Sequence, residues 1–226
     1  MNGEELVEFS DLSKIGHEIC DKLRILCVDY KDENSFIYKY NKVNIKDYYK
    51  NGDYDYKKIH DLYIRNAKLE EIECDYMRIT SVPVLPNMTV FYGDGNELTS
   101  FPIQTKMEIF NGRDNELTEF PIQPEMTKFY GDGNELTEFP IQPKMTEFYG
   151  NYNQLISFPI QPEMTVFYGD HNRLTSFPIQ PEMTTFCGHC NQLTSFPVQQ
   201  KMTAFYGRSN QLTSFPVQPK MTYCIK

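Results

Sequence analysis

The sequence predicts a parallel-sheet solenoid preceded by a small cap, and three features lead to this prediction. Residues 88–220 contain seven consecutive copies, here called units, of one 19-residue pattern. Each unit has apolar residues at positions 1, 4, 11 and 14, and prolines at position 15 and usually at position 18. A unit this short cannot bury its own apolar face and must stack on its neighbours. The two prolines and the missing 3.6-residue period exclude helix.

The units read M-T-x-F-Y-G-x-x-N-x-L-T-x-F-P-I-Q-P-x. Positions 3 to 5 form a short extended segment, so stacked units should build a parallel ladder at roughly 4.8 Å per strand. The phenylalanines at positions 4 and 14, from Phe91 to Phe215, should face one another and form the core. We expect the glycine at position 6 to make room for these rings. The prolines favour an extended convex side and strong curvature.

An asparagine occupies position 9 of every unit: Asn96, Asn115, Asn134, Asn153, Asn172, Asn191 and Asn210. Its amide group both donates and accepts, so at a buried turn it can satisfy backbone groups of its own and the next unit. Left unpaired, each amide would cost about 1–3 kcal/mol. The asparagines are therefore predicted to fix the register of the stack.

This pattern resembles the leucine-rich repeat, L-x-x-L-x-L-x-x-N-x-L, with Met or Phe in several leucine positions. It is more similar to the short repeats of secreted enterobacterial effectors, whose units end L-P-x-L-P where this chain has F-P-I-Q-P. The Asn-, Tyr-, Ile- and Lys-rich composition also resembles leucine-rich-repeat proteins of giant viruses. The resemblance implies a leucine-rich-repeat solenoid with its sheet on the concave face. Such effectors often add a ubiquitin-ligase domain, for which the repeats here leave no place.

Residues 1–58 are predicted to form an N-terminal cap. Residues 11–28 place apolar side chains on one face and predict an amphipathic helix, while residues 35–45 alternate partly like a strand. We expect the cap to cover the edge of the first solenoid strand. An adaptor module of F-box type, which would recruit other machinery, is the alternative.

Residues 59–226 are assigned to the solenoid. Its parts are degenerate units at 59–87, the seven regular units at 88–220 and a partial unit at 221–226. The partial unit is not a polar capping repeat, so the phenylalanine core and a strand edge are expected to be exposed there. Either this end pairs with another copy or partner, giving end-to-end oligomers, or the short tail folds over it.

Composition narrows the functional class. A net charge of -9 disfavours nucleic-acid binding, which needs a basic stripe. The sequence lacks a signal-like start and a membrane-span-like segment, and its six cysteines have no regular spacing. We therefore expect a protein of a reducing compartment, the cytoplasm, meaning the host cytoplasm or the virion for a viral protein, without a membrane or nucleic-acid partner.

Side chains at positions 3, 5 and 7 are expected on the concave face, because they alternate with core residues. Position 5 carries Tyr92, Asn111, Tyr130, Tyr149, Tyr168, Cys187 and Tyr206. Tyrosine offers a large amphipathic contact area at low entropic cost and is enriched at binding hot spots. This row predicts a partner-binding surface, although the rings can also serve only to stabilise the sheet.

Positions 7 and 8 differ most between units. The candidates for partner contact at these positions are Asp94, Arg113, Asp132, Tyr152, Asp170, His171, His189 and Arg208. Positions 12 and 17 stay almost uniform as Thr and Gln. If both are exposed, as we expect, the divergence at 7 and 8 favours selection for contacts over drift at tolerant sites.

Two thiols and two imidazoles, Cys187, Cys190, His171 and His189, lie close in the repeat and have the donor types of a zinc site. Their C-x-H-C spacing is not that of a standard finger, so we expect neither a metal nor another cofactor. The sequence has no Gly-rich phosphate loop, G-x-S-x-G or H-E-x-x-H motif. It predicts a non-catalytic scaffold that binds a protein; the alternatives are an adaptor acting through residues 1–58 and a structural protein joined through its C-terminal end.

Overall fold

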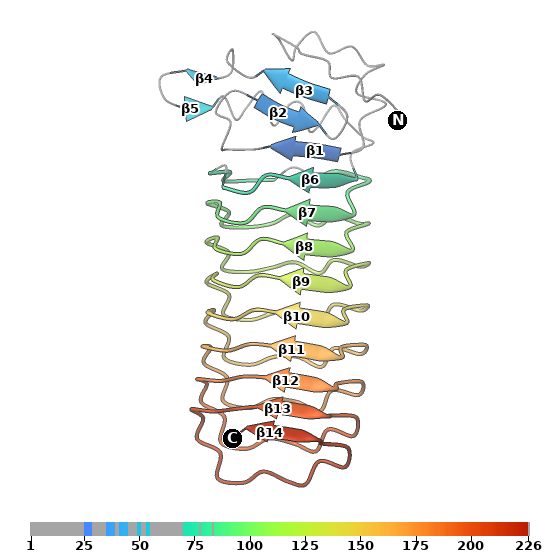
Figure 1. Ribbon diagram of the computed structural model, residues 1–226, viewed down its shortest axis with the longest axis vertical. Helices are drawn as coiled ribbons and strands as arrows, with labels where there is room; N and C mark the ends of the chain where they lie inside the picture. Colours follow the sequence, from blue (N-terminus) through green and yellow to red (C-terminus); the bar gives the residue numbers. More distant parts are fainter. Residues whose placement is uncertain are drawn as a thin grey trace.

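The computed structural model describes residues 70–225, apart from Met77 and Pro83, and five short strands nearer the N-terminus. These residues form a stack of turns with a sheet along one side (Figure 1). Twelve strands lie in the sheet in the order β14-β13-β12-β11-β10-β9-β8-β7-β6-β1-β2-β3. Within the described part there is no helix of the length and apolar character that would cross a membrane.

The solenoid strands confirm the prediction for positions 3 to 5. They are β6 (Glu71–Glu73), β7 (Val90–Tyr92), β8 (Ile109–Asn111), β9 (Lys128–Tyr130), β10 (Glu147–Tyr149), β11 (Val166–Tyr168), β12 (Thr185–Cys187), β13 (Ala204–Tyr206) and β14 (Tyr223–Ile225). Neighbours pair in parallel with equal repeat positions opposite each other, as where Phe148 faces Phe129 and Phe167. Period and register therefore coincide along the whole stack.

The N-terminal strands join the same sheet. β1 (Ile25–Val28) pairs in parallel with β6, and β2 (Ser35–Tyr38) pairs antiparallel with both β1 and β3 (Asn41–Asn44). A separate hairpin consists of β4 (Tyr49–Lys50) and β5 (Asp53–Tyr54). The predicted helix at 11–28 is wrong for its last four residues, because the open edge of β6 gives them a ladder partner. Residues 11–24 lie outside the described residues.

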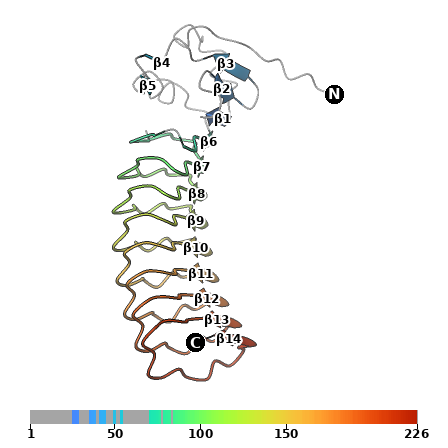
Figure 2. The ribbon, with the colours of Figure 1, turned by 60° about the vertical axis from the view of Figure 1, so that its left-hand side comes forward.

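Two interlocking rows of phenylalanine rings form the core, as predicted. Position-4 rings stack on the next unit, with centroids 5.3 Å apart between Phe148 and Phe167. Position-14 rings stack at 5.9 Å, as between Phe158 and Phe177. Edge-to-face contacts join the rows, with centroids 4.7 Å apart between Phe148 and Phe158. The wider spacing of the second row lets the stack bend toward the sheet (Figure 2).

This bend is gentle, and the strong curvature expected from the prolines is wrong. The physical reason is a second amide ladder on the side away from the sheet. Gln142 accepts a 2.7 Å hydrogen bond from the Gln123 amide through Oε1 and donates 3.0 Å to the Pro121 carbonyl through Nε2. The bonds recur at position 17 of successive units. They keep the back of each turn almost as close to its neighbour as the strands are.

The asparagines of position 9 form the predicted ladder, directed toward the preceding unit rather than the next. Nδ2 of Asn134 donates to the Gly112 carbonyl at 2.9 Å, and its Oδ1 accepts from the Leu117 amide at 3.0 Å. Nδ2 also reaches the Gly131 carbonyl of its own unit at 3.2 Å. Each asparagine thus holds two consecutive turns in one register.

Glycine at position 6 makes room for a ring, as predicted. A Cβ on Gly150 would lie 2.4 Å from Cζ of Phe148, closer than real carbon atoms approach. Phe148 is fully buried between two other rings and has no space to yield. The close approach of ring and backbone therefore excludes any side chain at this position.

Candidate functional site

Three tyrosines stack on the open face of the sheet. The ring centroids of Tyr130 and Tyr149 lie 4.8 Å apart, and those of Tyr149 and Tyr168 lie 4.9 Å apart with an interplanar angle of 8°. All three side chains are partly exposed. Asn111 ends this row on one side and Cys187 on the other. Partial burial raises the pKa of both Tyr149 and Tyr168, and the Glu147 carboxylate adds to this effect at Tyr149. Both phenols are therefore neutral at physiological pH.

Charged side chains border this tyrosine row. Lys128 Nζ lies 2.9 Å from Glu147 Oε1 on the adjacent strand. Arg113 Nε lies 3.0 Å from Asp132 Oδ2, and the guanidinium sits over the Tyr130 ring at 5.1 Å from its centroid. The row therefore combines a flat apolar centre with paired charges of both signs along its edge.

Position 7 is a hydrogen-bond ladder as well as a surface. The Arg113 amide donates to Asp94 Oδ1 at 2.8 Å, and the Asn151 amide donates to Asp132 Oδ1 at 2.8 Å. The ladder continues through Asp170 and His189, whose amides are accepted by the preceding unit. This bond needs an acceptor side chain, which Asp, Asn and His provide; Arg113 has no acceptor atom, and the ladder is interrupted there. Chemistry of the fold thus limits the variation at position 7.

Position 8 has a left-handed backbone in every regular unit. The φ angles are 65° at Gly95, 51° at Asp114, 68° at Gly133, 55° at Tyr152, 53° at His171, 54° at Cys190 and 57° at Ser209. Glycine adopts this conformation without strain, and small polar residues tolerate it. Tyr152 is mostly exposed there and stacks on His171 with ring centroids 4.4 Å apart. These side chains project from the turn beyond the strands.

The expectation about position 17 is wrong. Its glutamines are buried, with Gln142 and Gln161 both at 0% exposure, so hydrogen bonding explains their uniformity. Position 12 is exposed as expected, as at Thr137. Of the two uniform positions that were compared with positions 7 and 8, only position 12 is a surface position. The argument that divergence at positions 7 and 8 reflects selection for contacts therefore loses half of its support. The Pro-x-Gln-Pro segment has no hydrophobic periodicity that would indicate burial. Sequence reasoning missed the glutamine ladder for that reason.

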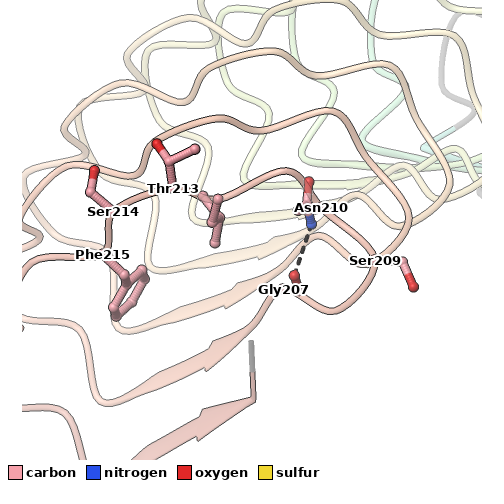
Figure 3. A pocket seen from close by; sticks show the side chains of 7 residues that line it. Gly207, Ser209, Asn210, Thr213, Ser214 and Phe215 are labelled. Atoms are coloured by element: carbon pink, nitrogen blue, oxygen red, sulfur yellow. Dashed lines mark hydrogen bonds between the residues drawn. The ribbon is translucent and has the colours of Figure 1, made fainter.

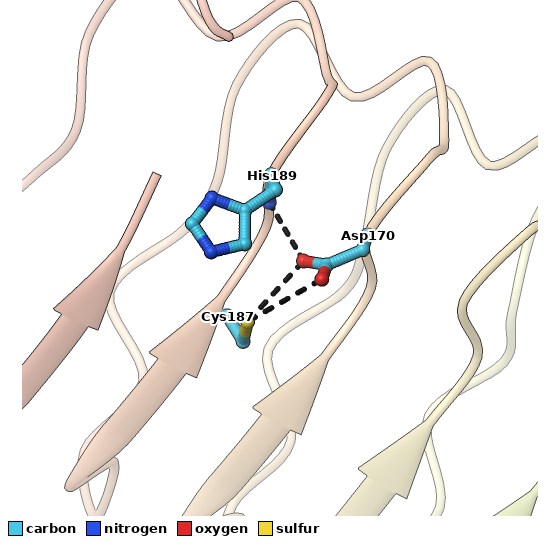
Figure 4. Close-up of side chains that lie close together, drawn as sticks. All are labelled: Asp170, Cys187 and His189. Carbon is cyan, nitrogen blue, oxygen red and sulfur yellow. Dashed lines mark hydrogen bonds between the residues drawn. The ribbon is translucent and has the colours of Figure 1, made fainter. Parts of the chain in front are cut away.

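Cys187, His189 and Asp170 come together at β11 and β12 (Figure 4). The Cys187 thiol donates to Asp170 Oδ1 at 3.3 Å, and the His189 amide donates to the same oxygen at 2.7 Å. Burial, and then the carboxylate of Asp170, raises the pKa of the Cys187 thiol to about 12. A thiol that keeps its proton is the opposite of an activated nucleophile. The sequence paired Cys187 and His189 with Cys190 and His171, which lie on position-8 turns; Asp170 joins the cluster in their place.

A pocket opens at the last complete turn (Figure 3). It is lined by Gly207, Ser209, Asn210, Leu212, Thr213, Ser214 and Phe215. Nδ2 of Asn210 donates to the Gly207 carbonyl at 3.0 Å and to the Gly188 carbonyl at 2.8 Å. Its amide therefore serves the asparagine ladder rather than a ligand.

Comparison with solved structures agrees with this geometry. The chain is similar to the leucine-rich effector protein YopM from Yersinia pestis, with a TM-score of 0.64 and 18% identity over 74% of this chain and 52% of that one. YopM from Yersinia enterocolitica gives a TM-score of 0.54 and 18% identity over 77% and 50%. A leucine-rich-repeat protein of Leptospira interrogans gives 0.51 and 14% over 94% and 67%.

The fold is therefore a leucine-rich-repeat solenoid, similar to that of the Yersinia effectors. At these identities the likeness is one of fold. The chain spans about half the length of the two YopM structures. No family model matches the sequence, and no curated protein does. The leucine-rich-repeat solenoid commonly serves as a scaffold for protein interaction.

Proposed function

We propose that this protein is a non-catalytic scaffold that binds a protein partner on the sheet face, centred on Tyr130, Tyr149 and Tyr168. The stack of these three partly exposed rings carries the proposal. Aromatic rings already held by their neighbours lose little conformational freedom when a partner covers them, so more of the contact energy remains as affinity.

The bordering charges support the same surface. Lys128, Glu147, Arg113 and Asp132 surround an apolar centre, which is the arrangement of hot spot and polar rim found at protein interfaces. The rim pairs leave both signs of charge accessible to a partner. A protein surface of mixed charge fits this face better than a nucleic acid, whose phosphates would meet Asp132 and Glu147.

The test compares two triple variants of the full chain as affinity baits. Tyr130→Ala/Tyr149→Ala/Tyr168→Ala removes the stack, and Ile141→Ala/Ile160→Ala/Ile179→Ala removes aliphatic side chains of the same units outside the sheet, each about half exposed. We expect a partner that the isoleucine variant retains and the tyrosine variant loses. Binding of that purified partner, measured by calorimetry, should weaken at least about tenfold, or 1.4 kcal/mol.

Circular dichroism and melting curves establish that both variants fold. Identical sets of retained proteins for both folded variants would contradict the proposal. The adaptor hypothesis stays a prediction, because residues 1–58 lie outside the described residues except for short strands. The same applies to assembly through the C-terminal end, for which no contact with another copy is described.

A further inference from the structure

Three side chains with metal-binding atoms meet on the sheet face. Asp170 follows β11, Cys187 ends β12, and His189 lies two residues further on. The ligand atoms of the three side chains all lie within 4.8 Å of one another. Among the residues that the structure describes, this is the single group of three His, Cys, Asp or Glu side chains with their ligand atoms so close together.

We propose that Asp170, Cys187 and His189 form a zinc-binding site. Zinc takes thiolate, imidazole and carboxylate ligands at about 2.0–2.3 Å in a tetrahedron, which places neighbouring ligand atoms about 3.5 Å apart. Cys187 Sγ lies 3.3 Å from Asp170 Oδ1 and 3.5 Å from Oδ2. Two of the three ligands thus have the required separation. Water fills the fourth position, as in zinc sites with three protein ligands.

The surrounding ladder orients the ligands. Asp170 Oδ1 accepts the His189 amide, and the Asp170 amide donates to Asn151 Oδ1 at 2.8 Å. Held in this way, the carboxylate has both oxygens near the sulfur, and Oδ2 is the one that does not accept the His189 amide. Such hydrogen bonds behind the ligands are a regular feature of metal sites. Cys187 stands where five other units have tyrosine, and it is 7% exposed.

His189 contributes the ring nitrogen that faces Cys187 in Figure 4. Nδ1 accepts a hydrogen bond from the Arg208 amide at 2.9 Å, so Nε2 is the ligand atom and carries the proton of the neutral ring. When zinc binds, this proton moves to Nδ1 and the Cys187 thiol proton goes to solvent. Nδ1 then no longer accepts, and the Arg208 amide loses its partner. Zinc binding therefore opens the last hydrogen bond of the position-7 ladder.

The first test is a cobalt titration of the reduced full chain, because a Co²⁺–thiolate bond gives a charge-transfer absorption band. We expect one equivalent of Co²⁺ to produce the band and one equivalent of Zn²⁺ to remove it. Cys187→Tyr, which restores the residue of five other units, should abolish the band. Asp170→Asn keeps the acceptor that Asn151 already provides in the ladder and should weaken binding at least tenfold. Cys190→Ser is the matched control and should leave the titration unchanged.

A wild-type chain without the band, or a band that survives in Cys187→Tyr, would overturn the proposal. So would equal loss in Cys190→Ser. Because no partner protein takes part, failure here is independent of the proposed scaffold function.

The second test follows the Arg208 amide by hydrogen exchange in NMR spectra with and without Zn²⁺. Exchange of this amide should become at least tenfold faster with zinc. The Arg113 amide, which Asp94 accepts in the same ladder, should exchange at an unchanged rate. Zinc binding that leaves the Arg208 amide protected would remove His189 from the site and overturn the three-ligand proposal.

Discussion

The Nδ2 group of Asn153 donates a 2.9 Å hydrogen bond to the carbonyl oxygen of Gly131, one unit earlier in the chain. Oδ1 of the same side chain accepts the Leu136 amide at 3.0 Å. Asn153 is 7% exposed, so the bonds are shielded from water. One side chain therefore completes two backbone groups of a neighbouring turn that the parallel ladder does not pair.

Asn153→Ala should lower the free energy of unfolding by about 1–3 kcal/mol, because the buried Leu136 amide loses its acceptor and the Gly131 carbonyl keeps only the 3.2 Å bond from Asn134. Urea denaturation followed by circular dichroism measures the change. Asn210→Ala is the matched control, since Asn210 makes the same bonds in a partly exposed place and should cost less. Equal losses in the two variants would argue against burial as the cause.

Gln142→Ala should destabilise the protein by about 1–3 kcal/mol, because it leaves the Gln123 amide and the Pro121 carbonyl without their partner. Thr137→Ala, at the exposed position 12 of the same unit, should change stability by less than about 0.5 kcal/mol. Chemical denaturation of both variants measures the difference. Similar small effects would show that the glutamine ladder contributes little.

Gly150→Ala should destabilise by about 1–3 kcal/mol, since the new Cβ would overlap the Phe148 ring. Phe148→Leu removes the ring that the new Cβ would overlap. Gly150→Ala should therefore cost less stability in the Phe148→Leu background than in the wild-type chain. A double-mutant cycle from melting or denaturant curves gives this coupling. Additive effects would mean that the alanine harms the turn through its backbone instead.

Asp170→Asn should speed alkylation of Cys187 by iodoacetamide at a fixed pH and in the presence of a chelator. The sign follows from charge: removing the carboxylate removes a cause of the raised pKa of the Cys187 thiol, so the thiolate fraction increases. Peptide mass mapping over time measures the rate at each cysteine. Exposed Cys224 is the internal control and should react at an unchanged rate. A Cys187 rate that stays equal or falls would contradict the assigned role of Asp170.

Periodicity carried most of the fold prediction. Strands at positions 3 to 5, the phenylalanine core and the space above Gly150 all follow from a pattern that repeats in the chain, because stacked identical units place equal positions next to each other. The segment ending at Val28 lacks the repeat, and its amphipathic pattern predicted helix where β1 pairs with β6. There the edge of an existing sheet outweighed the local preference.

The candidate site was less predictable. The tyrosine row followed from the alternation of the strands, and the stacking of Tyr149 between its neighbours confirms its geometry. The divergence at position 7 was interpreted as selection for partner contacts, yet Asn151 and Asp170 each accept the backbone amide of the next unit, which requires an acceptor side chain in these units. That requirement is visible only when the distance from one side chain to the next unit's amide is known.

The sequence by itself determined the period, the buried apolar positions, the parallel register and the surface that carries the tyrosines, since all of these depend on residue type and spacing along the chain. The tertiary structure decided that Gln142 is buried, that Tyr152 has a left-handed backbone, and that Asp170 rather than His171 meets Cys187. These outcomes depend on how each turn bends after its strand. Residues one unit apart in sequence are neighbours in space, but only the path of the turn determines which of their atoms face each other.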